Sequence, residues 1–159
     1  MAAFTNCDIT GAGPATVISS PVKSGDSPQT LLRFVNTHLS ATGNRSPIFL
    51  LAKSDADIHL YNTKLTPSAS NLIAATACYG ALDISLTAGD CDPFSATFTI
   101  SESKLNGDVE PRWPSTFVWA LDTYTAWTGS VRMPGNSTVC PQINIFLDDT
   151  STWNVTKES

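Results

Sequence analysis

The stretch PFSATFTIS, residues 93–101, alternates apolar side chains with small hydroxyl-bearing ones, and it decides the predicted fold class. Phe94, Ala96, Phe98 and Ile100 occupy every second position, and serine or threonine fills each position between them. Because successive side chains of a β-strand point to opposite faces, this pattern predicts a half-buried strand with one wet face.

Runs of similar length and pattern occur along the rest of the chain. They cover residues 15–20, 47–54, 56–63, 82–89 and 143–149. Ten prolines and nine glycines separate these runs at intervals typical of strands. Two further segments, 27–40 and 68–80, fit either a strand or a short helix, and both alternatives stay open.

Many short strands with little helix favour an all-β, antiparallel arrangement. Asn106 and Gly107 form the strongest tight-turn signal in the chain, and they predict a hairpin. No internal repeat or linker divides the sequence, so residues 1–159 are expected to form a single β-sandwich domain. A jelly-roll-like sandwich is the preferred fold.

The charge balance limits the partners that the protein can have. Nine lysines and arginines oppose fourteen aspartates and glutamates, and the cations are scattered singly rather than gathered in a stripe. Nucleic acid is therefore a poor candidate, because binding it requires clustered positive charge. No stretch is apolar for long enough to cross a bilayer, so membrane insertion is not expected. Low charge and many hydroxyls suit an extracellular or virion-surface protein.

Four cysteines allow three disulfide connectivities. The preferred pairing joins Cys78 with Cys91, which would close a short loop, and Cys7 with Cys140, which would tie the two ends of the chain. No cysteine spacing matches a zinc site. Four reduced core cysteines are the alternative, and they would belong to a reducing compartment.

Candidate catalytic or metal-binding residues are few. On the predicted strand at 56–63 and just before it, Asp55, Asp57 and His59 share one face, which could hold a metal or could simply be solvated. Ser27 follows Asp26, but Pro28 stands where a nucleophile elbow needs a different turn. We expect no metal and no cofactor, and we expect a protein that is not an enzyme.

The tryptophan-rich stretch 111–129 supplies the candidate binding residues. Trp119 lies in an apolar run and is predicted to be core. Trp113, between two prolines, and Trp127, before a turn signal, are predicted to lie at loops, where they either bind a ligand or cover the core. The predicted ligand-binding set is Arg112, Trp113, Tyr124 and Trp127.

Three classes of function fit these observations. The first is a recognition or attachment module, either a secreted lectin-like protein or a projecting domain of a virion capsid, which binds a glycan or a cell-surface receptor. The second is a self-assembling coat or shell subunit with a jelly-roll fold, and the third is a small secreted hydrolase. The sequence favours them in that order, and it is compatible with a small homo-oligomer.

Overall fold

The computed structural model describes residues 1–19, 30–44, 46–52, 54–68, 72–77, 93–111, 115–133 and 141–156. Within these ranges every regular element is a β-strand, and every paired strand runs parallel to its neighbour. The all-β prediction is confirmed. The antiparallel, jelly-roll-like sandwich is wrong.

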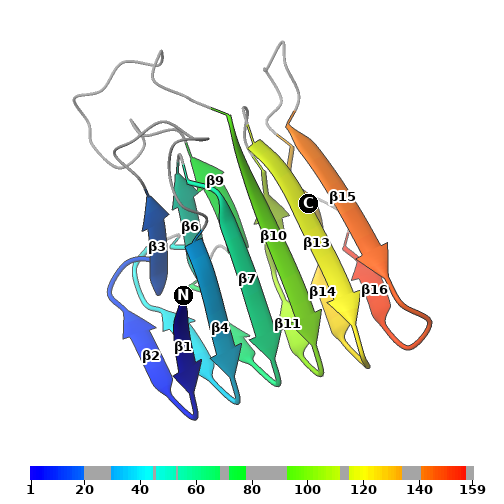
Figure 1. Ribbon diagram of the computed structural model, residues 1–159, viewed down its shortest axis with the longest axis horizontal. Helices are drawn as coiled ribbons and strands as arrows, with labels where there is room; N and C mark the ends of the chain where they lie inside the picture. The colour runs from blue at the N-terminus through cyan, green and yellow to red at the C-terminus, as the bar shows by residue number, and fades with distance from the viewer. Residues whose placement is uncertain are drawn as a thin grey trace.

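The chain winds as a solenoid whose turns, here called coils, stack side by side (Figure 1). The long sheet, which faces the reader in Figure 1, contains β1 (Ala2–Thr5), β4 (Thr30–Val35), β7 (Ala56–Tyr61), β10 (Phe94–Ser101), β13 (Ser115–Asp122) and β15 (Gln142–Leu147). Two strands that are neighbours in this sheet are therefore not consecutive in the chain, because the other strands and turns of one coil lie between them.

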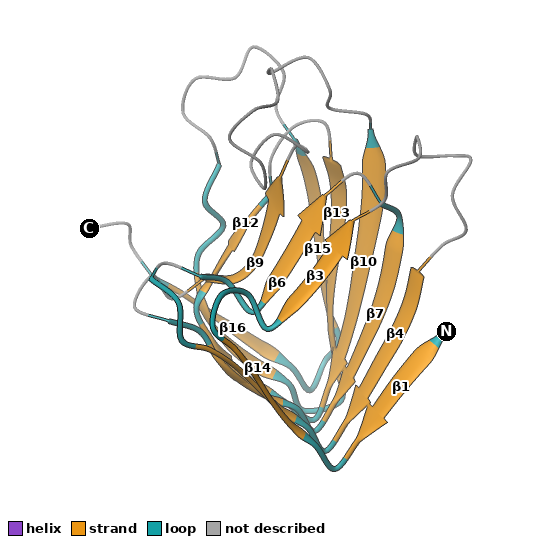
Figure 2. Ribbon diagram, turned by 90° about the vertical axis from the view of Figure 1, so that its left-hand side faces the viewer, coloured by secondary structure: helices purple, strands orange, loops and turns teal. Residues whose placement is uncertain are grey.

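Two further walls lie beside the long sheet, and Figure 2 shows them meeting it at an angle around a common interior. The second wall contains β2 (Asp8–Gly11), β5 (His38–Ala41) and β8 (Lys64–Thr66), followed by β11 (Lys104–Asn106), β14 (Ala126–Gly129) and β16 (Thr152–Val155). The third wall contains β3 (Thr16–Ser19), β6 (Phe49–Ala52), β9 (Leu72–Ala77) and β12 (Asp108–Glu110).

The interior is filled by rows of apolar side chains that the parallel register places directly above one another. One row of the long sheet consists of Phe4, Phe34, Leu60, Ile100, Leu121 and Leu147. The run at 93–101 behaves as predicted, since its apolar residues are buried while Ser95 is exposed. Burying one face of each strand against the shared interior provides the main favourable term in folding.

A single residue in the left-handed conformation turns the first three coils from the long sheet into the second wall. These residues are Asn6, Asn36 and Asn62, with φ of 54°, 49° and 44°. Asparagine tolerates this conformation better than most residues. The amide of Asn62 donates to Asn36 over 2.9 Å, and that of Asn36 donates to Asn6 over 3.2 Å, so the three side chains form a ladder.

This ladder reveals a repeat that the sequence analysis missed. Each of the three asparagines follows an inward Phe or Leu by two positions and precedes an inward Ile or Leu by three. The repeats are hard to see because the number of residues per coil varies. The expectation that the chain has no internal repeat is therefore wrong.

The predicted hairpin at Asn106 and Gly107 is also wrong. Gly107 does have a positive φ, 141°, but the strands on either side of it, β11 and β12, pair with different coils rather than with each other. The turn is a corner of the solenoid. Both ambiguous segments prove to be strands where they are described: 27–40 contains β4 and β5, and 68–80 contains β9.

Aromatic rings run through the interior from the first coil to the last. Phe4 stacks on Phe34, and after Phe49, Phe98 and Phe117 the series continues through Trp119, Trp127 and Trp153. The prediction that Trp119 is core is confirmed, since none of its surface is exposed. Its indole nitrogen is buried without a hydrogen-bond partner.

Candidate functional site

Of the four residues predicted to bind a ligand, the structure describes Tyr124 and Trp127, and these two do not share a surface. Trp127 is completely buried, its ring stacks on Trp153 at 4.8 Å, and its indole N–H donates to the Gly107 carbonyl over 2.8 Å. It therefore packs in the core and cannot be an exposed platform. Tyr124 is 73% exposed at the turn after β13. Arg112 and Trp113 lie outside the described residues.

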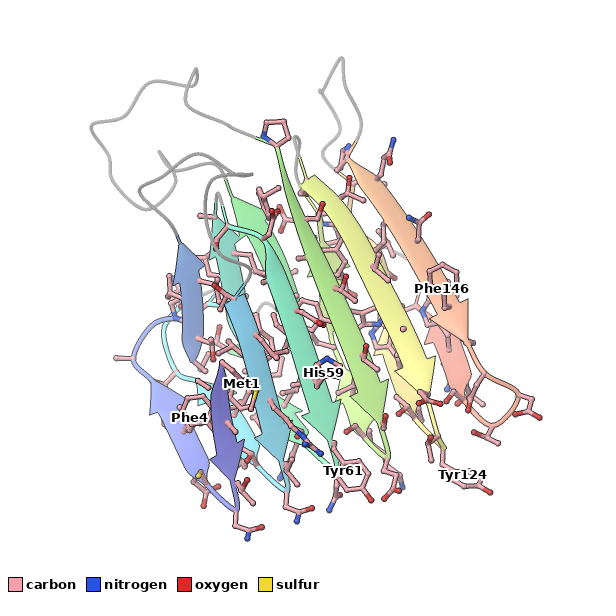
Figure 3. All side chains as sticks on the ribbon, in the orientation of Figure 1. Met1, Phe4, His59, Tyr61, Tyr124 and Phe146 are labelled. Carbon is pink, nitrogen blue, oxygen red and sulfur yellow. The ribbon has the colours of Figure 1, made fainter. Side chains whose placement is uncertain are left out.

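Polar side chains gather instead on the outer face of the long sheet, over β4, β7 and the end of β10. His59 and Tyr61 project along β7 (Figure 3). Arg33 lies beside His59 in the parallel register, and Thr99 follows on the other side. We call Arg33, Asp57, His59, Tyr61 and Glu102 the outer patch.

The sequence prediction of a shared polar face is correct for two of its three residues. Asp57 and His59 both face outward, and the Oδ1 of Asp57 lies 3.2 Å from the Nε2 of His59. Asp55 precedes the strand, and its carboxylate accepts the backbone N–H of Ser95 over 2.7 Å. Asp55 therefore joins two coils, while Asp57 and His59 form a pair on the surface.

Tyr61 is held in place by its neighbour in the next coil. Its hydroxyl donates to Glu102 over 2.9 Å, while 41% of the residue surface stays exposed. This hydrogen bond, together with the negative charge of Glu102, raises the pKa of Tyr61 above its ordinary value. The ring is thus oriented and neutral, with accessible surface that a ligand can cover.

Arg33 supplies the positive charge of the outer patch. Its side chain is exposed, and among the described residues no carboxylate pairs with it. With Met1, Leu31, His59, Tyr61, Thr99 and Ser101 it lines a shallow depression of about 330 Å³. A planar guanidinium beside an aromatic ring and hydroxyl groups can bind a carboxylate or a sugar hydroxyl while the ring contacts an apolar face.

A second polar cluster lies at the corner near the start of the chain, and sequence analysis did not identify it. His38 places Nδ1 3.3 Å from Asp8 and Nε2 2.8 Å from the hydroxyl of Thr66. Both ring nitrogens are engaged by residues of adjacent coils, because β5 pairs with β2, which carries Asp8, and with β8, which carries Thr66. The cluster could not be identified from the sequence because only the parallel pairing of the strands brings these residues together.

The predicted disulfide between Cys7 and Cys140 is wrong, because Cys7 is a free thiol. Its Sγ donates to the carbonyl of Thr5 over 3.1 Å. Thr37 and Thr63 make the same bond to the residue two positions earlier, at 3.0 and 3.1 Å. Cys7 thus takes the place of a threonine at the corner. The predicted partners Cys78 and Cys91 lie outside the described residues.

The described part of the chain contains no group of three or more ligand side chains that could hold a metal ion. Asp148 anchors a turn: its carboxylate accepts the backbone N–H of Thr123 over 2.9 Å and the hydroxyl of Thr150 over 2.8 Å. The pKa of Asp148 is lowered chiefly by hydrogen bonding from Ser151, with further bonds from Thr150 and Thr123 opposing its partial burial.

No helix of the described residues is long and apolar enough to cross a membrane. Comparisons with protein-family models, with curated proteins and with solved structures find nothing similar to this chain.

Proposed function

We propose that this protein is a non-enzymatic recognition module that acts on an exterior surface, extracellular or on a virion, and binds a glycan or a protein receptor. The binding surface is the outer patch on the long sheet rather than the aromatic loops. The observation that carries the proposal is the exposed Arg33, which pairs with no carboxylate of the described residues and lies beside the fixed ring of Tyr61 in a shallow depression.

The depression beside Arg33 favours a ligand that carries an anionic group, because neither carboxylate of the outer patch, Asp57 or Glu102, lines it. The protein is acidic overall, with a net charge of −5, so an exposed arginine that no carboxylate in the described ranges pairs with is a local exception. Arginine and tyrosine are the residue types in which binding energy is most often concentrated. The flat sheet holds their backbones in register, which lowers the entropy lost when a ligand is bound.

The exterior location now rests on composition and on the hydroxyl-rich surface, because Cys7 does not form the disulfide that would have supported it. Solenoids present extended surfaces that suit recognition. The solenoid therefore replaces the predicted sandwich as the scaffold, and it supports the same class of function that the sequence favoured.

Binding to a glycan panel and to cell surfaces tests this proposal. Arg33→Ala should weaken the binding found for the wild type by about 1 to 3 kcal/mol. Arg33→Lys should restore only part of it, because lysine keeps the charge but loses the planar fork. Lys104→Ala removes one exposed positive charge from the second wall and is the matched control.

The outcome that contradicts the proposal is equally clear. If Arg33→Ala and Tyr61→Ala bind every tested surface as the wild type does, the outer patch is not the recognition site. A binding loss of the same size in Lys104→Ala would show that total charge rather than the patch is responsible.

A small hydrolase is the second candidate, and one observation favours it. The Asp57 and His59 pair, 3.2 Å apart, is the arrangement in which a carboxylate orients an imidazole for proton transfer. A hydrolytic activity that His59→Ala abolishes and Lys104→Ala leaves unchanged would replace the recognition proposal.

A further inference from the structure

The two ends of the solenoid expose strand edges of the same kind. In the described strands, β1 pairs only with β4, and β15 pairs only with β13, so each has one edge without a partner. The same holds for β2 and β16 in the second wall. Unpaired strand edges are templates for pairing with another chain.

Apolar surface accompanies both edges. At the first coil, Phe4, Ile9, Ile18 and neighbouring residues line an opening of about 420 Å³ into the interior. At the last coil, Leu147 is 43% exposed and Val155 is 67% exposed, and both lie in strands with an open edge. Terminal repeats of solenoids ordinarily carry polar caps, and the described end coils carry apolar side chains instead.

We propose that the last coil of one copy docks on the first coil of a second copy, so that the chain assembles head to tail through continued parallel sheets. Because all strands of a wall point the same way, the last coil of one molecule and the first coil of the next meet without reversal. Two first coils or two last coils would meet with opposite strand directions.

The register rows fit this contact. Continuing the rows of the long sheet places Ile145 over Ala2 and Leu147 over Phe4 of the next copy, so apolar residues meet on the inward face. On the outward face of the same strands the exposed Phe146 covers Ala3, which is small. A shift by one residue would put every apolar side chain on the wrong face, so the register is well specified.

The asparagine ladder adds polar complementarity. Each ladder amide donates to the coil before it, and the amide of Asn6 has no such acceptor within the described residues. The turn after β15 carries the exposed Asp149, which follows Leu147 by two positions as Asn6 follows Phe4 of the same row. In the docked arrangement Asn6 has an acceptor in the corresponding turn of the preceding copy.

A head-to-tail contact that does not close produces open chains of molecules rather than a fixed oligomer. The wild-type protein should therefore form a ladder of species in sedimentation velocity, and their size should rise with concentration. Electron microscopy should show them as unbranched filaments.

Two variants, each blocked at one end of the solenoid by lysine substitutions, test whether the contact is head to tail. One variant carries Leu147→Lys and Val155→Lys at the last coil, and the other carries Ile9→Lys at the first coil. Each should raise the apparent dissociation constant for assembly by roughly tenfold or more, because docking would bury an unpaired ammonium. Mixed together, the two should form a heterodimer, because the free last coil of one docks on the free first coil of the other. Assembly should stop there, since both remaining ends carry the blocking lysines.

Tyr124→Ser is the matched control, because it removes an exposed apolar side chain from a turn rather than from an end strand. It should assemble as the wild type does. Circular dichroism and thermal melts check that each variant folds. If the last-coil variant does not fold, Phe146→Lys at the outward face of β15 replaces it, and if the first-coil variant does not fold, Ala3→Lys at the outward face of β1 replaces it.

Three results would overturn the proposal. The first is a wild type that stays monomeric at all concentrations, which would mean that the ends are not self-complementary. The second is assembly that persists in both blocked variants. The third is a mixture of the two variants that forms no heterodimer.

Discussion

The first three coils and the last three build the same solenoid with different chemistry. In the first three, asparagine occupies the left-handed corner and its amides form a ladder. In the later coils that conformation falls on Glu102, Thr123 and Tyr124, which are poorly suited to it. The interior differs as well: the interior rings described in the first three coils are all phenylalanines, whereas the later coils add Trp119, Trp127 and Trp153 to their phenylalanines.

The difference shows two ways of stabilising a coil: a residue suited to the left-handed corner, or hydrogen bonds from neighbouring turns together with large buried rings. Where asparagine makes the left-handed corner favourable, hydrogen bonds between the side chains of adjacent coils are enough to stabilise the corner. Where the corner is strained, it is held by outside groups, since Asp148 accepts the N–H of Thr123 and the hydroxyl of Thr150 accepts the N–H of Tyr124. Stacked indoles beneath it supply large buried area.

The largest expected effect comes from breaking the tryptophan stack. Trp127→Ala should lower the free energy of unfolding by about 3 to 5 kcal/mol, because it removes a fully buried ring and its bond to Gly107. Urea titration followed by circular dichroism measures this loss.

Substitution by phenylalanine separates packing from hydrogen bonding. Trp119→Phe removes an indole N–H that has no partner, while Trp127→Phe leaves the buried Gly107 carbonyl without its donor. Trp127→Phe should therefore cost about 1 to 3 kcal/mol more than Trp119→Phe. Equal losses would mean that the indole bond contributes nothing.

A smaller effect should follow from breaking the asparagine ladder at its middle. Asn36→Ala removes two ladder bonds and places a residue with no local polar group at a φ of 49°. The expected cost is about 1 to 2 kcal/mol. Thr10→Ala, which removes one exposed hydroxyl bond on the second wall, is the control and should cost much less. A comparable loss in the control would contradict the importance of the ladder.

The turn anchor of the later coils should depend on pH. Hydrogen bonds depress the pKa of Asp148 in the folded state, so its carboxylate stabilises the protein above the pKa of the unfolded chain, about 3.9. That contribution is lost as the pH falls toward the folded pKa. Asp148→Asn should lower the melting temperature at pH 7, and the difference from the wild type should shrink below about pH 4. A difference that does not change with pH would rule out the ionised carboxylate as its cause.

The smallest expected effect is a gain in stability. Thr123 is β-branched and has a φ of 46°, so Thr123→Asn should relieve strain and raise stability by about 1 kcal/mol or less. The backbone N–H that Asp148 accepts is unchanged by this substitution. A loss of stability would show that the threonine side chain contributes more than its backbone strain costs.

Part of the candidate site could be predicted from the sequence. The alternation around residues 56–61 places Asp57 and His59 on the outward face and Ile58 on the inward one, as the structure shows. The participation of Arg33 and Glu102 could not be predicted, because they belong to other coils and reach the patch only through parallel pairing.

The same distinction applies to the fold. The sequence alone determined the strand character of β3, β6, β7, β10 and β15, and which side of β7 and β10 is apolar, because a side-chain period of two is a local property. Trp119 was recognisable as core for that reason. Parallel pairing, the corner at Gly107, the free thiol of Cys7 and the burial of Trp127 were decided by the tertiary structure. Each depends on which strand lies beside which, and an alternating pattern is equally compatible with parallel and antiparallel neighbours.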